Sequence, residues 1–214
     1  MTTSTRGRPK DPQLQQQRKD ALLDATLELL ASKSYRSITI REIAEKAKMK
    51  SAMVSYYFDG KEGLVIGLMD RISINNFKHV EKALTLENPL LEVIKTVLKF
   101  MVKNAPMTRL ISDEVISKEG PLKDYFMSKI PHRIASLFQN ILIKVQAAGL
   151  AKKDLNLQWT AFNLWSLLAT PILIAPIFES AWKIGFDEVQ SDAWAENIYH
   201  LFMKGIACEN SAIS

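Results

Sequence analysis

Cysteine, glycine and proline are all scarce in this chain of 214 residues. The one cysteine, Cys208, excludes a disulfide within the chain and fits a reducing compartment. Eight glycines and eight prolines leave room for long helices. The basic first ten residues are not followed by an apolar run, so we expect no signal peptide and a cytoplasmic location in a bacterium.

The sequence also lacks signatures of β structure and of catalysis. No stretch alternates between apolar and polar residues for long enough to predict a strand. The motifs GxSxG, HExxH and GxxxxGK[ST] are absent. The three histidines, His79, His132 and His200, are far apart, and none pairs with another residue at metal-ligand spacing. We therefore expect an all-α protein that is not an enzyme and has no metal and no cofactor.

The longest uncharged run lies between Asp154 and Glu179 and has 24 residues. It is long enough to cross a bilayer, which takes about 20 residues. Polar residues at helical spacing argue against a membrane span; they are Thr160, Asn163, Ser166 and Thr170. A helix apolar on nearly all sides is buried in a large core or in an interface. The run therefore predicts a helix that packs on its own subunit on one side and on a second subunit on the other.

The positive charge is confined to the first third of the chain. Residues 1–61 hold 12 Lys and Arg against 7 Asp and Glu, which gives 12 − 7 = +5, the net charge of the whole chain. Residues 62–214 hold 16 of each and are neutral. This asymmetry predicts an anion-binding module joined to a neutral body. The alternative is a solvated basic tail.

Three helices are predicted in the basic region. Apolar residues recur at helical spacing from Arg18 onward, and Ser34 ends this first helix. Thr39 and Glu42 form the pattern of a capping box, which starts a second, short helix. A third helix covers residues 51–58. Two short helices joined by a short turn are typical of a helix-turn-helix, whose second helix enters the major groove of DNA.

The remainder is helical in pattern throughout. A helix follows the second Asp-x-x-Glu cap at residues 59–62. Pro131 is expected to break one long segment near its middle, and Gly149 is expected to end that segment. The further segments expected to be helical are 89–104, 106–117, 121–148, 156–175 and 192–208.

Residues 18–64 resemble the DNA-binding domain of the tetracycline-repressor (TetR) family of bacterial transcriptional regulators. The resemblance rests on Thr-Ile-Arg-Glu-Ile-Ala-Glu-Lys-Ala at 39–47, Tyr-Tyr-Phe at 56–58 and Lys-Glu-Gly-Leu at 61–64. It implies a basic arm at 1–12, a helix-turn-helix domain at 13–62 and a larger helical domain for ligand binding and dimerisation at 63–214. The implied function is a sequence-specific regulator, either a repressor released by a small molecule or an activator. The alternative is a helical enzyme or ligand-carrying protein with an incidental basic N-terminus.

The sequence departs from the family pattern at the turn. Lys48 stands where the family has a turn glycine, and Lys50 stands where it has a capping serine, with Ser51 next to it. A left-handed conformation at Lys48 would cost on the order of 1 kcal/mol relative to glycine. Ser51 is expected to cap the third helix one residue late, or the cap is missing.

The resemblance also implies which residues contact DNA. Thr39, Tyr56 and Lys61 are expected at the phosphate backbone. The expected groove-facing residues are Lys50, Ser51, Ala52, Met53 and Ser55. Arg6 and Arg8 belong to an Arg-Gly-Arg-Pro sequence similar to an AT-hook, which would read a narrow minor groove; a generic basic tail is the equal alternative.

Two further sets of residues are assigned to the large domain. A pocket for a small apolar or amphipathic ligand is expected among Phe100, Met101, Met107, Phe126, Phe138, Phe162, Trp165 and Phe178, although for any single one of them a place in the core is the favoured alternative. The expected dimer interface includes Ser166, Trp194, Ile198, Leu201 and Phe202. The expected partners are a palindromic double-stranded operator, a second copy of the chain and the ligand, with no membrane.

Overall fold

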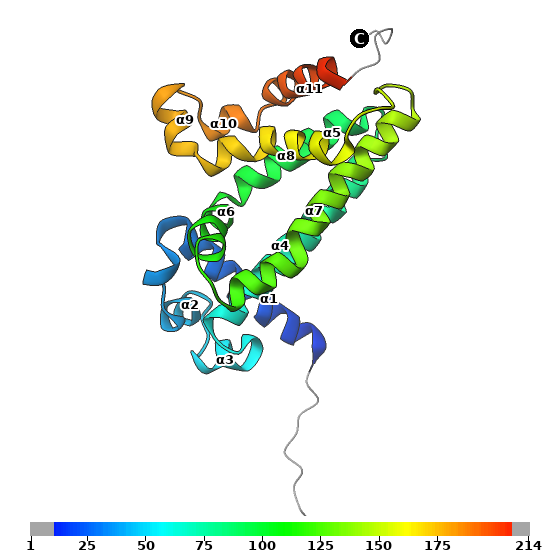
Figure 1. Cartoon of the computed structure of the whole chain (residues 1–214). Helices are drawn as coiled ribbons and strands as arrows, with labels where there is room; N and C mark the ends of the chain where they lie inside the picture. Colours follow the sequence, from blue (N-terminus) through cyan, green and yellow to red (C-terminus); the bar gives the residue numbers. More distant parts are fainter. Residues whose placement is uncertain (1–10, 207–214) are drawn as a thin grey trace, which may run out of the picture. The chain divides into compact units, whose positions relative to one another are not determined.

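The computed structural model describes residues 11–206, drawn in colour in Figure 1. The chain divides into two compact units, residues 1–70 and residues 71–214. The described part consists of helices and their connections and contains no strand. The predicted all-α class is therefore confirmed. The expected basic arm with Arg6 and Arg8, and Cys208, lie outside the described residues.

The first unit is built from three helices and the beginning of a fourth. A short 3₁₀ turn at Tyr35–Ser37 follows the first helix. The unit's core is formed by apolar side chains of all four helices, including the fully buried Leu22, Ile43, Val54 and Leu64. The helices are α1 (Pro12–Ser32), α2 (Ile40–Lys46), α3 (Ala52–Phe58) and α4 (Lys61–Ala83), which continues into the second unit.

Helix α1 begins earlier than its apolar pattern indicates. The carboxylate of Asp11 accepts a hydrogen bond from the backbone amide of Gln13 at 2.9 Å, and Pro12 occupies the first helical position. Both features are favourable at a helix start. The first turns of α1 are polar and exposed, so hydrophobic periodicity became visible only at Arg18.

The second unit contains the rest of α4 and seven further helices in its described part. Its core joins buried side chains of α5, α7, α8 and α11. Helix α5 packs against α8 and α11, and α7 packs against α8, which it crosses at an angle (Figure 1). The helices are α5 (Pro89–Lys103), α6 (Ala105–Leu110), α7 (Pro121–Ala147), α8 (Leu157–Leu173), α9 (Ala175–Ala181), α10 (Phe186–Val189) and α11 (Asp192–Ile206).

Three predictions about these helices need correction. Pro131 lies inside α7 and does not break it; α7 continues to Ala147, and Gly149 follows in a left-handed conformation as expected. Residues 106–117 are not one α-helix, because α6 is followed by a π-helical segment at Ile111–Ile116. Helices α9 and α10 were not predicted. They are 7 and 4 residues long, which is too short for a 3.6-residue period to repeat.

An ion pair fixes the start of α11 on α5. The ammonium nitrogen of Lys99 donates a hydrogen bond to Asp192 Oδ1 at 2.9 Å, and Lys95 lies 3.7 Å from Asp192 Oδ2. These two lysines, with the Lys99 hydrogen bond as the main cause, lower the pKa of Asp192. The pair therefore orients α11 at its N-terminal end, where an acidic residue also interacts favourably with the helix dipole.

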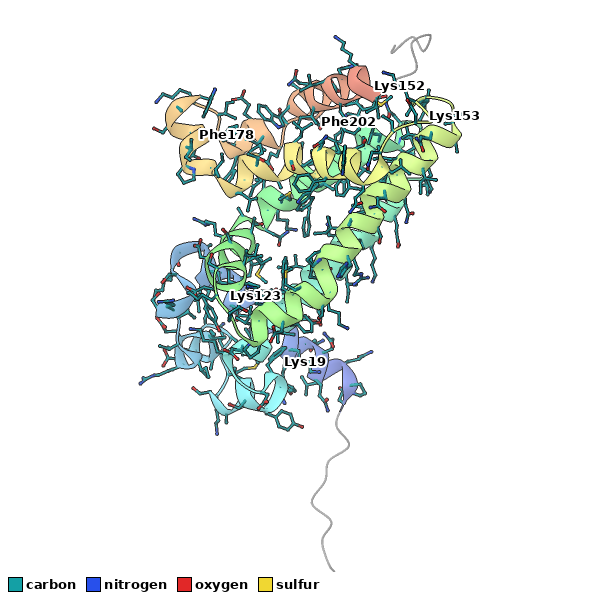
Figure 2. The ribbon with its side chains drawn as sticks, viewed as in Figure 1. Lys19, Lys123, Lys152, Lys153, Phe178 and Phe202 are labelled. Atoms are coloured by element: carbon teal, nitrogen blue, oxygen red, sulfur yellow. The ribbon has the colours of Figure 1, made fainter. Side chains whose placement is uncertain are left out.

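The uncharged run forms two helices that meet at a bend. Lys152 and Lys153 precede α8 (Figure 2). Within residues 11–206, no single helix is long and apolar enough to cross a membrane. Helix α8 and residues 175–182 meet the length and composition criteria only when taken together, and they are bent by 71° relative to each other.

Candidate nucleic-acid interface and ligand cavity

The turn between α2 and α3 begins with two backbone hydrogen bonds that close the end of α2. Lys48 has a φ of 55°, so the left-handed conformation considered for it is present. Its amide donates to the carbonyl of Glu45 at 3.0 Å, and the amide of Met49 donates to the carbonyl of Ala44 at 2.8 Å. This is the hydrogen-bond pattern of a Schellman motif, in which glycine is the usual left-handed residue. The motif ends α2 and directs the chain into α3.

The start of α2 carries the predicted capping box, which is confirmed. The amide of Glu42 donates to Thr39 Oγ1 at 3.2 Å, and the amide of Thr39 donates to Glu42 Oε2 at 2.8 Å. Lys33 donates to Glu42 Oε1 at 2.5 Å. Lys33, followed by the two donors of Thr39, lowers the pKa of Glu42 to about 2. The stabilisation from ionised Glu42 is therefore complete above its usual pKa and is lost as the pH falls towards about 2.

Thr39 is thus already engaged at the groups assigned to phosphate binding. Its amide and its hydroxyl, at 2.9 Å, both donate to the same oxygen of Glu42. A phosphate at this helix start would have to share or replace the Glu42 carboxylate. The capping box therefore fixes α2, and a phosphate contact at Thr39 depends on a rearrangement of Glu42.

Helix α3 presents one exposed face. Val54 points into the core and is fully buried. Ser51 begins the helix without a side-chain capping bond. Of the aromatic run, Tyr56 is 56% exposed while Tyr57 and Phe58 are half-buried. The residues assigned to the DNA groove are exposed at Lys50, Ser51, Ala52 and Ser55, and half-buried at Met53.

Lys61 lies at the first position of α4 and contacts the 3₁₀ turn. Its ammonium nitrogen donates to the carbonyl oxygen of Tyr35 at 2.5 Å and lies 4.1 Å from the centroid of the Tyr35 ring. The side chain is half-buried there. Lys61 therefore ties the start of α4 to the 3₁₀ turn that follows α1, in addition to any role at the DNA backbone.

Two glycines of α4 make room for Phe58. A Cβ atom on Gly63 would lie 1.7 Å from the backbone carbonyl oxygen of Phe58. A Cβ atom on Gly67 would lie 2.8 Å from a ring carbon of Phe58, which is a side-chain atom. The close approach at Gly63 involves backbone on both sides and cannot be relieved by a rotamer change. Gly63 thus sets the distance between the end of α3 and the start of α4.

We expect Gly63→Ala to destabilise the first unit by at least about 3 kcal/mol, because overpacking against fixed backbone forces the helices apart. Gly205→Ala in α11 is the control, since a Cβ atom there meets nothing within 4 Å. Alanine in an open helical position should raise stability by about 0.5–1 kcal/mol. Urea unfolding followed by circular dichroism measures both. Equal unfolding midpoints for Gly63→Ala and the unaltered protein would contradict the packing described.

The second unit contains a cavity of about 790 Å³. It lies among α5, α6, the π-helical segment, α7 and α8. Six of the eight residues expected at a pocket line it: Phe100, Met101, Phe126, Phe138, Phe162 and Trp165. The ring of Phe138 meets that of Trp165 edge to face, with centroids 5.8 Å apart. The size is that of sites for small molecules.

Met107 and Phe178 are not among the residues that line this cavity. Met107 is buried on α6. Phe178 lies on α9 (Figure 2). Its ring centroid is 5.3 Å from that of Trp182. The sequence prediction missed the polar residues of the wall, which are Thr108, Gln139, Gln158 and Asn163. Gln139 directly follows Phe138, and Asn163 directly follows Phe162, so helical neighbours of the aromatic residues were the available signal.

The exposed apolar side chains gather on the helices expected at the dimer interface. Within residues 11–206, eight of the sixteen exposed large apolar side chains lie on α8, around α9 and on α11: Trp159, Phe162, Leu167, Leu173, Ile174, Ile177, Trp182 and Leu201. Two of the eight, Trp159 and Phe162, also line the cavity. Leu201 is 61% exposed, and Ser166 is half-buried. Such a concentration is unusual for the surface of a monomer.

Three residues of the expected interface face the core instead. The side chains of Ile198 and Phe202 (Figure 2) are 4% and 7% exposed. The side chain of Trp194 packs against the same core cluster. Within the single chain, Ile198 and Phe202 therefore belong to the core and Trp194 is partly buried against it, whereas Leu201 is exposed and Ser166 half-buried. Helix α11 is apolar on two sides. The spacing of its apolar residues in the sequence did not distinguish the side that faces α5 from the side that carries Leu201.

No group of three or more His, Cys, Asp or Glu side chains in the described part of the chain is arranged to hold a metal ion.

Comparison with known sequences matches the first unit to a family of regulators. The model of the bacterial regulatory proteins of the tetR family matches residues 22–68. The HTH-type transcriptional regulator YvkB of Bacillus subtilis (strain 168) is 41% identical over 61 residues, 28% of this chain and 32% of that protein. The probable HTH-type transcriptional regulator YttP of the same strain is 28% identical over 103 residues, 45% of this chain and 50% of that protein. The chain thus spans about a third and a half of these relatives.

Comparison of structures covers both units. The crystal structure of the transcriptional regulator FadR from Bacillus subtilis, in complex with stearoyl-CoA, matches with a TM-score of 0.71. The match covers 87% of this chain and 98% of that chain, at 16% sequence identity. At this identity the likeness shows the fold alone, which has an N-terminal helix-turn-helix domain and a larger helical domain.

Proposed function

We propose that this protein, a member of the tetR family of bacterial regulatory proteins, is a homodimeric transcriptional repressor that a small molecule releases from its operator. The observation that carries the proposal is the exposed face of α3, which follows a helix and a fixed turn. A second helix held in this way is the element that enters the major groove in helix-turn-helix proteins. The net charge of +5 in residues 1–61 supports an anionic partner.

The proposed contacts divide into three groups. Lys50 and Ser55 offer polar groups to base edges, while Ala52 and Met53 offer apolar contact to a thymine methyl group. Tyr56, with Thr39 and Lys61, serves the phosphate backbone. Ser51 joins the groove-facing residues, and the basic arm with Arg6 and Arg8, outside the described residues, is proposed for the minor groove.

Control by a ligand follows from geometry and linkage. A dimer reads a palindromic site when its two recognition helices are about 34–36 Å apart, one turn of the duplex. A ligand that binds better to another spacing lowers the affinity for the operator, and the operator lowers the affinity for the ligand by the same factor. The cavity of about 790 Å³ in the second unit is the proposed ligand site. A regulator of this fold that was solved with stearoyl-CoA, a ligand with a long apolar chain, supports this assignment.

The test of the function is to retain genomic DNA fragments on the purified protein and to sequence them. Enrichment of one palindromic sequence is expected. A ligand-carrying protein or a helical enzyme with an incidental basic N-terminus would retain fragments without sequence preference, and that result would overturn the proposal.

At the recovered site, Lys50→Ala is expected to reduce the free-energy difference between the preferred and the other base pairs at one position by about 1–3 kcal/mol, because the contact of the lysine with a guanine is lost. Lys61→Ala is expected to weaken binding to all sequences alike. The slope of the logarithm of the binding constant against the logarithm of the salt concentration should become shallower by about one. Lys144→Ala, an exposed lysine on α7 in the second unit, is the control. Fluorescence anisotropy at several salt concentrations measures the three variants. Affinity unchanged at every salt concentration for Lys50→Ala and Lys61→Ala would remove both residues from the interface.

A further inference from the structure

The wall of the cavity in the second unit carries no formal charge. None of the nineteen residues that line it, all within the part of the chain that the structure describes, is Asp, Glu, Lys, Arg or His. An ion whose charged group lies against this wall loses part of its hydration and meets no counter-ion, which disfavours it. The aromatic and aliphatic residues that form most of the wall instead favour an apolar body.

Polar side chains are few in the wall, and apart from Thr108, whose hydroxyl donates to the carbonyl oxygen of Asn104 at 3.5 Å, they are amides. Three side-chain amides line the cavity: Gln139 on α7, and Gln158 and Asn163 on α8. Gln158 and Asn163 are exposed, so water satisfies them, whereas Gln139 is half-buried. No hydrogen bond of the Gln139 amide occurs among the described residues. A primary amide both donates and accepts, so it matches a group that does the same.

We infer that the cavity takes an uncharged ligand, with a long apolar part and one amide- or hydroxyl-like group that is bound by Gln139. This inference rests on the proposed function, since it names the class of molecule that would control DNA binding. It excludes free carboxylic acids in their ionised form and organic cations. The ligand's apolar part contacts the aromatic wall around Phe138 and Trp165.

The test compares three probes that share one alkyl chain: decanamide, decanoate and decyltrimethylammonium. Binding to the full-length protein is followed by tryptophan fluorescence at about pH 8, where decanoate is ionised. Trp159 and Trp165 line the cavity and report on occupancy. Decanamide is expected to bind at least about tenfold more tightly than either ion. Equal or tighter binding of decanoate or decyltrimethylammonium, or no binding of decanamide, would overturn the inference.

A charge placed at Gln139 tests the position of the polar group. Gln139→Glu is expected to weaken decanamide about tenfold and to bind decyltrimethylammonium more tightly than the unaltered protein does. Asn140→Asp is the matched control, because it adds the same charge on the next residue of α7, which is exposed and does not line the cavity. Asn140→Asp should leave the three affinities within about twofold. The same affinities in Gln139→Glu as in Asn140→Asp would overturn the role of Gln139.

A second variant at Gln139 and a DNA-binding assay on the same preparations separate a failure to fold and a failure of the proposed function from a failure of the ligand assignment. Where Gln139→Glu shows no cooperative thermal transition, Gln139→Leu replaces it, and decanamide should then bind about fivefold more weakly, as expected for one lost hydrogen bond. Unchanged decanamide affinity in Gln139→Leu would overturn the role of Gln139. Retention of genomic DNA is measured on the same preparations. Its failure overturns the proposed function and leaves the ligand preference standing, whereas a preference for ions overturns only the inference.

Discussion

Replacing Leu201 by glutamate is expected to abolish operator binding, although Leu201 lies on α11 in the second unit. Its side chain is 61% exposed, on one of the helices where exposed apolar residues gather. We propose that α8 and α11 pair with their copies across a two-fold axis as a four-helix bundle. An obligate interface of this kind buries more than about 2,000 Å² in total, and a carboxylate at its centre would be buried without a partner. The variant should be monomeric and should bind DNA at least about a hundredfold more weakly, since one half-site is lost.

Leu86→Glu provides the matched control for this variant. Leu86 is also an exposed leucine of the second unit, at 46%, but it lies between α4 and α5. It should remain a dimer with unaltered DNA affinity. Sedimentation velocity and anisotropy measure both properties, and Ser166→Arg on α8 repeats the test from the other helix. If Leu201→Glu and Ser166→Arg both sediment as dimers with full affinity, the interface lies elsewhere.

Removing residues 1–70 is expected to abolish DNA binding altogether while leaving a folded dimer. The core cluster of the second unit begins at Val80, so none of its buried residues is removed. The deletion also takes out the buried side chains of α4 that belong to the first unit, such as Leu64 and Leu68, which would otherwise be exposed. Residues 1–70 hold 12 Lys and Arg against 9 Asp and Glu, so the deletion removes a net charge of 12 − 9 = +3 and leaves 5 − 3 = +2. The cluster of positive charge in residues 1–61 leaves with the deleted part, so most of the electrostatic contribution to DNA binding should be lost.

The readouts for the truncated protein are circular dichroism, sedimentation and binding to the recovered operator. Helical signal with dimer sedimentation and no retained DNA is the expected combination. Truncated protein that still binds the operator at moderate salt would show that the second unit contributes DNA contacts. Truncated protein that sediments as a monomer would instead place part of the dimer interface in the first unit.

The sequence predicted the helix-turn-helix in detail because its signals are local. A capping box involves residues three apart, and the Thr39–Glu42 pair could be recognised from the letters alone. The left-handed conformation at Lys48 was considered because the family that the sequence resembles has a glycine at this position of the turn, and the structure has it with a φ of 55°. The start of α1 was missed because its first turns are polar on all sides, so only the Asp11 cap marked the beginning of the helix.

In the second unit the sequence identified apolar helices but not which side of each faces the core. Trp194, Ile198 and Phe202 follow the helical period as regularly as an interface would, and only packing against α5 assigns them to the core. The cavity shows the same limit. Its aromatic residues were conspicuous in the sequence, whereas Gln139 is an ordinary polar residue until the fold brings α7 against α8. Helical periodicity shows that one face of a helix is apolar, but it does not show whether that face is covered by the core of the same subunit, by a ligand or by a second subunit.

The lysine at the turn after α2 joins two properties of the first unit that are usually independent. The left-handed backbone conformation of Lys48 costs on the order of 1 kcal/mol relative to glycine. A glycine at position 48 would keep the two hydrogen bonds that end α2, because both are made by backbone amides. Glycine at position 48 would remove one exposed positive charge beside α3. Resistance to unfolding and attraction for a polyanion therefore change in opposite directions at this single position. The positive charge of Lys48 therefore comes with a loss of folding stability, in the turn that sets the direction of α3.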